Sequence, residues 1–326
     1  MQRVWEAFEN PLGLDGFSFL EFSSNLVPEI KSFFERLGFI YQGTDECSLY
    51  SQGNINLFVD ENPHKYKNLC EGGYISAIGW RVKDAAIALE EAVKRGAEVA
   101  DSTKKDLPAI YGIGSCLIYF VDSIGEEKLK IKNNVESITR LEYIDHIDHN
   151  VKPGRIDHWV NFYKEIFNFK EIKYFDIEAG DTAIIAKGVA SPCGKMAINI
   201  VESHVGNNYV DRYLAQQDEG IQHVAYHAAN LCNAIEFMRS QGQKFLPVFD
   251  EYYLGIKEKY PDCTEDIERL KTNGILIDCS NKSCLQQVFT LQEQCCKPLF
   301  FEFINRQNYD GFGDVNVRNF LKSIES

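Results

Sequence analysis

The sequence predicts an α+β fold of two domains, each built from a pair of βαβββ units. Three observations predict it: a strand–helix–strands pattern recurs four times, every helix ends at Gly or Asn, and one polar stretch separates the copies two and two. That stretch, residues 123–140, places the predicted boundary between a first domain of residues 1–135 and a second of residues 136–326. A chain of 326 residues is long enough for two such domains.

The first half contains two of the units. Residues 16–24 read as a strand, and the helix after them ends at Gly38, with an apolar face of Ile30, Phe33, Phe34 and Leu37. Residues 74–82 read as the second strand, Asp84 caps its helix, and Gly96 ends it, with an apolar face of Leu89, Ala92 and Val93. A hairpin over 48–60 turning at QGN and a strand over 115–122 complete this half.

The second half repeats the pattern. Residues 143–150 (YIDHIDHN) form the third strand, followed by a helix that ends at Asn168, with an apolar face of Ile156, Trp159, Val160, Tyr163 and Phe167. Residues 220–228 (GIQHVAYHA) form the fourth, and Asn230 caps a helix that ends at Gly242, with an apolar face of Leu231, Ile235 and Met238. Strands at 285–290 and 298–304 close this half, and a helix over 315–324 offers Phe320, Leu321 and Ile324 for docking.

Composition excludes several classes of protein. The net charge of −14, with no compensating Lys/Arg stripe, argues against a nucleic-acid partner. No stretch approaches the ~20 apolar residues of a membrane span, and the N-terminus shows no signal-peptide pattern. The ten cysteines have neither CxxC nor disulfide-like spacing, which predicts reduced thiols, a cytoplasmic protein and no zinc site made of cysteine. A homo-oligomer is left open.

Two histidines and a glutamate stand inside three of the predicted strands: His146, His223 and Glu302. Two imidazoles and one carboxylate, with the other coordination positions open, are the ligand set of non-haem Fe(II) oxygenases. Strand alternation puts Ile144, His146 and Asp148 on one face, and Asp145, Ile147 and His149 on the other. Glu302 lies between phenylalanines, where a carboxylate is costly unless a cation compensates it.

The repeat sharpens this hypothesis. The equivalents of His146, His223 and Glu302 in the first half are Glu21, Ala77 and Tyr119, so we expect a metal only in the second half. His149 competes with His146 but faces the other way, and its replacement by alanine is expected to be nearly silent. His227 shares the face of His223 but lies about 13 Å further along an ideal strand. The remaining histidines are expected to be solvated, one at a helix start and two in loops: His158, His64 and His204.

The chain resembles the 4-hydroxyphenylpyruvate dioxygenase family, in the bacterial branch labelled hemolysin or legiolysin, within the vicinal oxygen chelate (glyoxalase-like) superfamily. The matching motifs cover nearly the whole chain: NPLGLDGFSFLEF, LYSQGNINLFV, GWRVKDA, LPAIYGIG, IDHIDHNV, NFYKEIFNF, EGIQHVA, LQQVFT, PLFFEFINR and GFGDVN. The resemblance implies two open-barrel domains, of which the first is metal-free and the second holds Fe(II) through His146, His223 and Glu302. It also implies O2 and an aryl-2-oxo acid as substrates, with homogentisate as the product of tyrosine and phenylalanine catabolism.

The resemblance also implies the pocket. Gln287 and Asn316 match catalytic positions, and Asn316 begins a C-terminal helix that covers the site. Other matched substrate-binding residues are Gln222, Phe289, Phe300 and Phe312, the last two sandwiching the ring. Four positions depart from the family pattern: Val201 replaces Asn (with Asn199 two residues earlier), Tyr209 replaces Gln, Val317 replaces Phe and Thr182 replaces Ser.

These departures leave two alternatives to the first function. A relative of hydroxymandelate synthase would hydroxylate the side chain of the same or a similar acid in place of the ring. A non-catalytic aromatic-acid binder, or a pigment-linked hemolysin, would need no chemistry at all, but retention of all three ligands argues against it.

Overall fold

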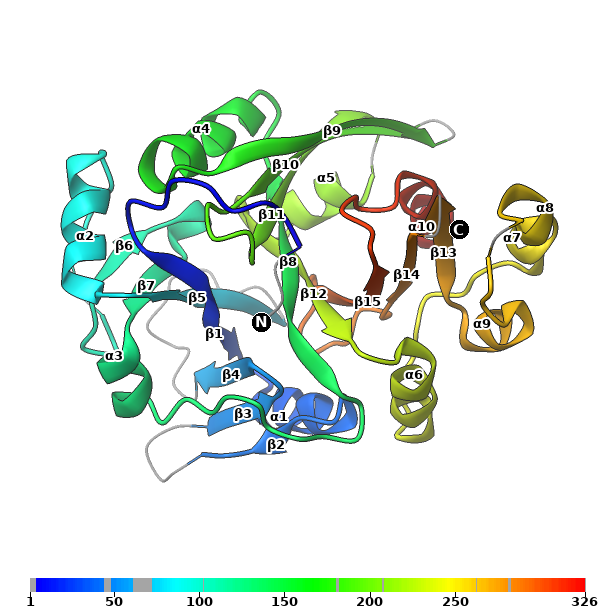
Figure 1. The fold of residues 1–326 in the computed structure, drawn as a ribbon, viewed down its shortest axis with the longest axis horizontal. Coiled ribbons are helices and arrows are strands. Elements are labelled where there is room, and N and C mark those ends of the chain that lie inside the picture. Colours follow the sequence, from blue (N-terminus) through cyan, green and yellow to red (C-terminus); the bar gives the residue numbers. More distant parts are fainter. Residues whose placement is uncertain are drawn as a thin grey trace.

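Two mixed β-sheets, one in each half of the chain, organise the molecule (Figure 1). The structure is a computed structural model that describes residues 4–43, 48–60, 72–101, 103–179, 182–206, 208–261, 263–280 and 283–325. The sheets divide between residues 121 and 141, and the predicted domain boundary at 135/136 falls within that segment.

The first sheet has seven strands in the order β2-β3-β4-β1-β5-β7-β6. They are β1 (Leu14–Ser24), β2 (Ile40–Tyr41), β3 (Ser48–Gln52), β4 (Ile55–Asp60), β5 (Gly73–Val82), β6 (Ala109–Tyr111) and β7 (Leu117–Val121). Its helices are α1 (Val27–Arg36), α2 (Ala85–Lys94), the short η2 (Ile113–Ser115) and α3 (Ser123–Lys128).

The second sheet has eight strands in the order β13-β14-β15-β12-β8-β11-β10-β9. They are β8 (Leu141–Val151), β9 (Lys170–Ala179), β10 (Thr182–Ala190), β11 (Ala197–Val205), β12 (Gly220–Ala228), β13 (Leu276–Ser280), β14 (Ser283–Phe289) and β15 (Phe300–Gln307). The helices are α4 (Ile156–Phe167), α5 (Tyr209–Leu214), α6 (Leu231–Ser240), α7 (Asp250–Tyr253), α8 (Ile256–Lys259), α9 (Ile267–Asn273) and α10 (Asp314–Glu325).

The topology confirms the paired-unit prediction. In every unit the first strand runs parallel to the last, as β1 does to β4 and β8 does to β11. The first strands of two successive units pair antiparallel, β1 with β5 and β8 with β12. The predicted helix starts are also confirmed, since Asp84 accepts a hydrogen bond from Ile87 N and Asn230 from Asn233 N.

Each sheet has a helix-covered face and an enclosed face. Helix-side residues of both halves share one core, in which Trp80 of β5 meets Phe167 of α4 at 4.4 Å and Phe33 of α1 meets Phe301 of β15 at 5.1 Å between ring centroids. The second sheet is curled, because Phe175 on edge strand β9 and Leu276 on the opposite edge strand β13 belong to one enclosed cluster. Phe301 and Phe303 point toward the helices, as predicted.

Two of the three bulges between the central strands β8 and β12 lie directly before the two candidate histidines. Between β8 and β12, Ala225 pairs with His146 and Tyr226 with Ile144, so Asp145 is an extra residue. Ile221 pairs with His149 and His223 with Asp148, so Gln222 is the other. A bulge turns neighbouring side chains to the same side of a strand. The predicted alternation is therefore wrong at Ile144, which packs on the helix side, and at Asp145, which joins His146.

Three smaller predictions are wrong. Val93 is 43% exposed, because the buried face of α2 runs through Ala85, Ala88 and Ala92 instead. His204 is exposed as expected but lies on strand β11, not in a loop. The thiols are not all reduced, since Cys279 and Cys284 form a disulfide. These two cysteines pair directly across the β13–β14 hairpin with Cα atoms 4.2 Å apart, a proximity that depends on the strand register.

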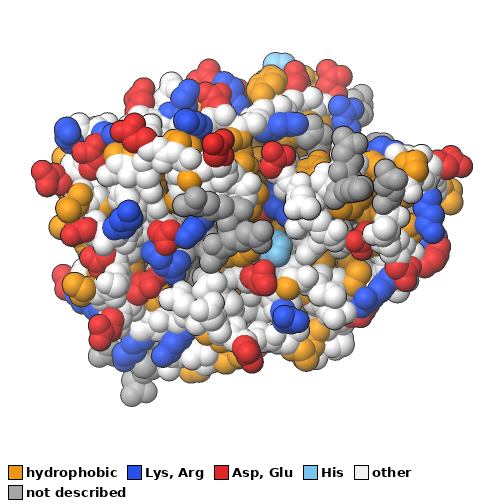
Figure 2. All heavy atoms as spheres, in the orientation of Figure 1, with side chains coloured by type: hydrophobic (Ala, Val, Ile, Leu, Met, Phe, Trp, Pro, Cys, Tyr) orange, Lys and Arg blue, Asp and Glu red, His pale blue; other side chains and the backbone are white. Residues whose placement is uncertain are grey.

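The surface mixes charges of both signs. Figure 2 shows acidic and basic side chains interspersed over the visible face. Among the described residues, no helix has the length and apolar character that crossing a membrane would require.

Candidate metal centre

Three side chains far apart in the sequence meet on the enclosed face of the second sheet. His146 on β8, His223 on β12 and Glu302 on β15 each offer one ligand atom, and these atoms lie within 4.8 Å of one another. Glu302 Oε2 is 3.3 Å from His146 Nε2 and 3.5 Å from His223 Nε2. All three side chains are buried. The adjacency of these central strands, β8, β12 and β15, is what brings the residues together.

A carboxylate behind His146 fixes its ring. Asp145 Oδ1 lies 2.7 Å from His146 Nδ1. Arg306 donates two hydrogen bonds to the Asp145 carboxylate, from Nε at 2.6 Å and from Nη2 at 2.7 Å. The bulge at Asp145 makes this contact possible. Because Nδ1 donates its proton to Asp145, Nε2 is the atom directed at Glu302, which is the arrangement commonly found behind metal-binding histidines.

Charges within the cluster stabilise one another. Burial opposes ionisation of Glu302, but the facing imidazoles of His146 and His223 lower the pKa of Glu302 to about 2. Burial likewise opposes the charged form of His146, but Glu302 and Asp145 raise the pKa of His146 to about 10. A metal binds neutral imidazole, so it must displace the second ring proton of the charged His146. Metal binding is therefore expected to strengthen as the pH rises.

An amide relay positions Glu302 from the other side. Gln287 on β14 donates through Nε2 to Glu302 Oε1 at 2.8 Å, and its Oε1 accepts from Asn316 Nδ2 at 2.8 Å. Asn316 in turn accepts from the Tyr252 hydroxyl at 3.1 Å. A Cβ atom at Gly313 would collide with Gln287 Oε1, so only glycine lets the turn into α10 approach this amide.

The cluster opens into a small apolar cavity of about 50 Å³. Helix α10 contributes Val317 and Phe320 to its wall, and Phe320 packs on Phe289 with ring centroids 4.5 Å apart. Ligand pockets usually exceed 300 Å³. The structure therefore shows the site in a closed form that admits a few water molecules and no aromatic acid.

The structure brings most of the predicted pocket residues to this cavity. Beyond the cluster, its wall includes Val201, Tyr209, Gln287, Phe289, Phe312 and Val317. Four predicted residues do not line it. Gln222 is the bulge residue and directs Nε2 to Tyr209 O, and Phe300 lies behind His223, stacked at 4.7 Å. Asn316 reaches the site only through Gln287, and Thr182 sits at the start of β10.

Asp148 and Asn199 are cavity residues that the sequence prediction missed or left open. Asp148 Oδ1 lies 3.4 Å from His223 Nε2 and accepts from Asn199 Nδ2 at 2.9 Å. Burial raises the pKa of Asp148, while His223 and His146 oppose that rise. Strand alternation had already placed Asp148 beside His146, so its presence in the wall was readable from the sequence. The wall also includes Phe175, Ile177, Ile184, Ala186 and Phe320.

The other histidines that the structure describes lie outside the cavity. His149 is fully buried on the helix side, with Nε2 2.6 Å from the Tyr163 hydroxyl. His227 is buried against Tyr143 at 4.6 Å and near Glu142, and His158 is exposed at the start of α4. His64 lies outside the described residues.

Because His149 is buried as a neutral ring, it should make the stability of the protein depend on pH, and replacing it should weaken that dependence. Burial lowers the pKa of His149 to about 3, against about 6.5 in an unfolded chain. The unfolded state therefore binds more protons between these values, and the free energy of unfolding falls by up to about 1.4 kcal/mol per pH unit as the pH drops through this window. Urea denaturation at pH 7 and pH 5 should show that the free energy of unfolding falls by about 2 kcal/mol more in the parent than in His149→Gln. Equal losses in both proteins would contradict this assignment.

In the first half, an ammonium group stands beside the equivalent of the metal cluster. Lys105 Nζ contacts Glu21 Oε2 at 2.6 Å and lies 4.0 Å from the centroid of the Phe58 ring. Ser76 donates to Glu21 Oε1 at 3.0 Å. Thus Glu21, the predicted equivalent of His146, already has a cation that is part of the chain.

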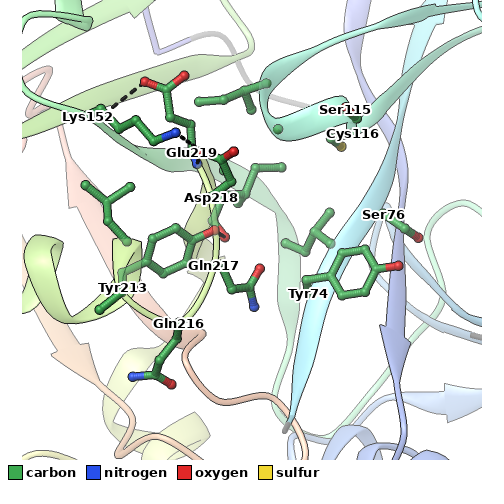
Figure 3. A pocket seen from close by; sticks show the side chains of 17 residues that line it. Tyr74, Ser76, Ser115, Cys116, Lys152, Tyr213, Gln216, Gln217, Asp218 and Glu219 are labelled. Carbon is green, nitrogen blue, oxygen red and sulfur yellow. Dashed lines mark hydrogen bonds and ion pairs between the residues drawn. The ribbon is translucent and has the colours of Figure 1, made fainter. Parts of the chain in front are cut away.

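A wider pocket of about 620 Å³ lies between the halves, away from the cluster (Figure 3). Its wall combines residues of the first half, such as Ser76 and Cys116, with the segment around Gln217. Several of its polar groups hold the chain itself: Lys152 pairs with Asp218 at 2.6 Å, and Gln217 donates to Gly73 O at 3.1 Å. Its lining contains no histidine, so it is not a second candidate for the metal chemistry.

The fold and the site define a class: the chain is a vicinal oxygen chelate protein with a buried His–His–Glu group. Residues 143–260 match the model of the glyoxalase/bleomycin resistance protein/dioxygenase superfamily. Residues 8–144 match that of the N-terminal part of hydroxyphenylpyruvate dioxygenase. The chain belongs to the 4-hydroxyphenylpyruvate dioxygenase family of enzymes.

Full-length relatives carry this assignment. The chain is 35% identical to hemolysin VllY of Vibrio vulnificus, covering 97% of this chain and 95% of the relative. It is 35% identical to 4-hydroxyphenylpyruvate dioxygenase of Pseudomonas sp. strain P.J. 874, covering 98% and 96%. A mutant of 4-hydroxymandelate synthase from Streptomyces coelicolor shares the fold with a TM-score of 0.78 at 19% identity, covering 96% and 98%.

The cluster suits a metal ion on its own chemistry. Neither ring nitrogen of the buried His223 has a hydrogen-bond partner among the described residues, although Nε2 faces two carboxylates. A buried polar atom in this position normally has a partner, and a cation among the three groups would supply one.

Replacing Asp145 by Asn is expected to weaken metal binding by about 10- to 100-fold, because His146 loses the carboxylate that orients it. Competition against a chelator of known affinity measures the change. Circular dichroism should show that the variant remains folded although the buried side chain of Arg306 loses its carboxylate partner. Parent-like affinity in a folded variant would show that Asp145 does not support the site.

Proposed function

We propose that this chain is an Fe(II)-dependent dioxygenase that converts 4-hydroxyphenylpyruvate and O2 to homogentisate and CO2 in the cytoplasmic breakdown of tyrosine and phenylalanine. The observation that carries the proposal is the convergence of His146, His223 and Glu302 beside an aromatic cavity. Relatives named 4-hydroxyphenylpyruvate dioxygenase that match over nearly the full chain support the choice of substrate.

Each group of the site has a part in this proposal. His146, His223 and Glu302 would hold Fe(II), which supplies open positions for the two oxygens of a 2-oxo acid and for O2. Gln287 fixes the orientation of Glu302, and Asn316 fixes Gln287. Phe289, Phe312 and Phe320 offer ring faces and edges to an aromatic substrate and keep water from the site.

Substrate entry in this proposal requires α10 to move. The cavity of about 50 Å³ has Val317 and Phe320 of α10 in its wall. Displacing this helix would enlarge the cavity and separate Asn316 from Gln287, while the three ligands themselves stand on the sheet.

The alternative is side-chain hydroxylation, as in hydroxymandelate synthase. This alternative rests on five residues that face the cavity and would determine the orientation of the substrate ring. They are Asp148, Asn199, Val201, Tyr209 and Val317. Neither alternative changes the proposed metal ligands.

Product analysis distinguishes these functions. The protein is loaded with Fe(II) without oxygen, supplied with 4-hydroxyphenylpyruvate and exposed to O2. We expect equal amounts of homogentisate and CO2. Formation of 4-hydroxymandelate in place of homogentisate, again with an equal amount of CO2, would establish the alternative. Absence of O2 uptake with a panel of aryl-2-oxo acids would instead identify a non-catalytic binder. Glu302→Ala serves as the inactive control.

A further inference from the structure

Three cysteines meet at one edge of the second sheet, apart from the His–His–Glu cluster. Cys279 on β13 is bonded to Cys284 on β14, and Cys263 lies in the loop between α8 and α9. Their sulfur atoms all lie within 4.8 Å of one another. Cys263 itself is free and half-buried. The prediction that cysteine makes no metal site was based on the spacing of the cysteines along the chain. The fold nevertheless brings three of them together.

A pocket of about 640 Å³ opens onto the trio. Its wall includes Cys263, Cys279 and Cys284 together with polar groups such as Lys259 and Glu265. Cys263 and Cys279 are partly exposed, and Cys284 is 7% exposed. Small solutes therefore have access to the sulfur atoms.

The loop that carries Cys263 is held in place on both sides. The Tyr260 hydroxyl donates to Asp278 Oδ1 at 3.0 Å, directly beside Cys279, and Cys263 N bonds to Tyr260 O at 3.0 Å. Gln307 Nε2 on β15 donates to Glu265 Oε1 at 2.9 Å. These bonds make the approach of Cys263 to the disulfide a property of the folded chain.

We propose that Cys263, Cys279 and Cys284 form a thiolate site for a zinc-like divalent cation, which opens when the Cys279–Cys284 bond is reduced. A dithiol reductant breaks the S–S bond, each sulfur gains one electron and one proton, and the dithiol closes to its own disulfide. The three thiols then release their protons to solvent as the cation binds. Tetrahedral zinc–thiolate bonds of about 2.3 Å place sulfur atoms about 3.8 Å apart, which is within the present spread of the trio. The fourth coordination position would be open to solvent through the pocket.

This site is independent of the proposed oxygenase function, since the two clusters share no residue. A reducing compartment would keep the bond open and the site available. An oxidising compartment would keep the disulfide formed. The reduction potential of the surroundings therefore determines whether the hairpin carries a disulfide or a metal ion.

Cobalt(II) titration tests the proposal, because only thiolate ligands give cobalt its sulfur charge-transfer absorption in the near ultraviolet. The full-length protein is reduced with dithiothreitol, desalted without oxygen and titrated. We expect about one equivalent of thiolate-bound cobalt in the reduced protein, none in the oxidised protein, and loss of the signal in Cys263→Ser. Cys232→Ser, which removes a half-buried cysteine outside the trio, should keep the signal. Glu302→Ala should keep it too, because it affects only the other cluster.

Two results would overturn the proposal: no charge-transfer band in the reduced parent, or a band of parent intensity in Cys263→Ser. Circular dichroism checks that Cys263→Ser is folded. Cys279→Ala provides a second variant that removes a sulfur from the other side of the trio, and it must lose the band as well.

Discussion

Glu302→Ala is expected to abolish retention of the catalytic metal while leaving the fold largely intact. The carboxylate is the one anionic member of the candidate ligand group, and without it the two imidazoles lose their shared neighbour. Changes behind a ligand already weaken metal binding by 10- to 100-fold, so removal of the ligand should exceed about 100-fold. Metal analysis after dialysis against a weak chelator measures the loss.

Asp148→Asn is the matched control for this experiment. Asp148 is the other carboxylate of the cavity wall and lies 3.4 Å from His223 Nε2, yet it stands outside the proposed ligand group. The Asp148→Asn variant should retain about as much metal as the parent. Parent-like metal content in Glu302→Ala would refute the ligand assignment, and selective loss in Asp148→Asn would show that the wrong carboxylate was chosen.

Lys105→Met is expected to destabilise the first half strongly. It leaves the buried Glu21 carboxylate without its cation, and breaking a buried ion pair from one side typically costs about 3–5 kcal/mol. Urea denaturation measures the change. The double variant Glu21→Gln/Lys105→Met should recover most of it, because no charge is then left buried.

Lys94→Met provides the comparison at an exposed pair. Lys94 contacts Glu91 at 3.4 Å but is 75% exposed, so water screens the pair and its removal should change the free energy of unfolding little. If Lys105→Met is no more destabilising than Lys94→Met, the ammonium does not stabilise Glu21 in the manner described.

The sequence predicted the parts of the fold that depend on local pattern. Apolar spacing and caps located the helices after Asp84 and Asn230, and the four-fold repeat predicted the paired βαβββ units. Residue type identified His146, His223 and Glu302 as candidate ligands, and the same repeat limited the expected metal to the second half. Local regularity was sufficient for all of these.

What escaped prediction depends on exceptions to that regularity. Strict alternation turned Asp145 away from His146, and a single extra residue in β8 reverses that conclusion. Cys279 and Cys284 show no diagnostic spacing, and only the register of their hairpin reveals the bond. Gln222 and Phe300 were placed in the pocket by resemblance alone, which does not resolve whether a side chain stands in a wall or behind it.

The closed cavity beneath α10 has a kinetic consequence. An enzyme whose reaction chamber is smaller than its substrate must open and shut once in every cycle, so the frequency of that motion sets an upper limit on turnover. Added viscogen should then slow the steady state, while a single pre-bound turnover would proceed undisturbed.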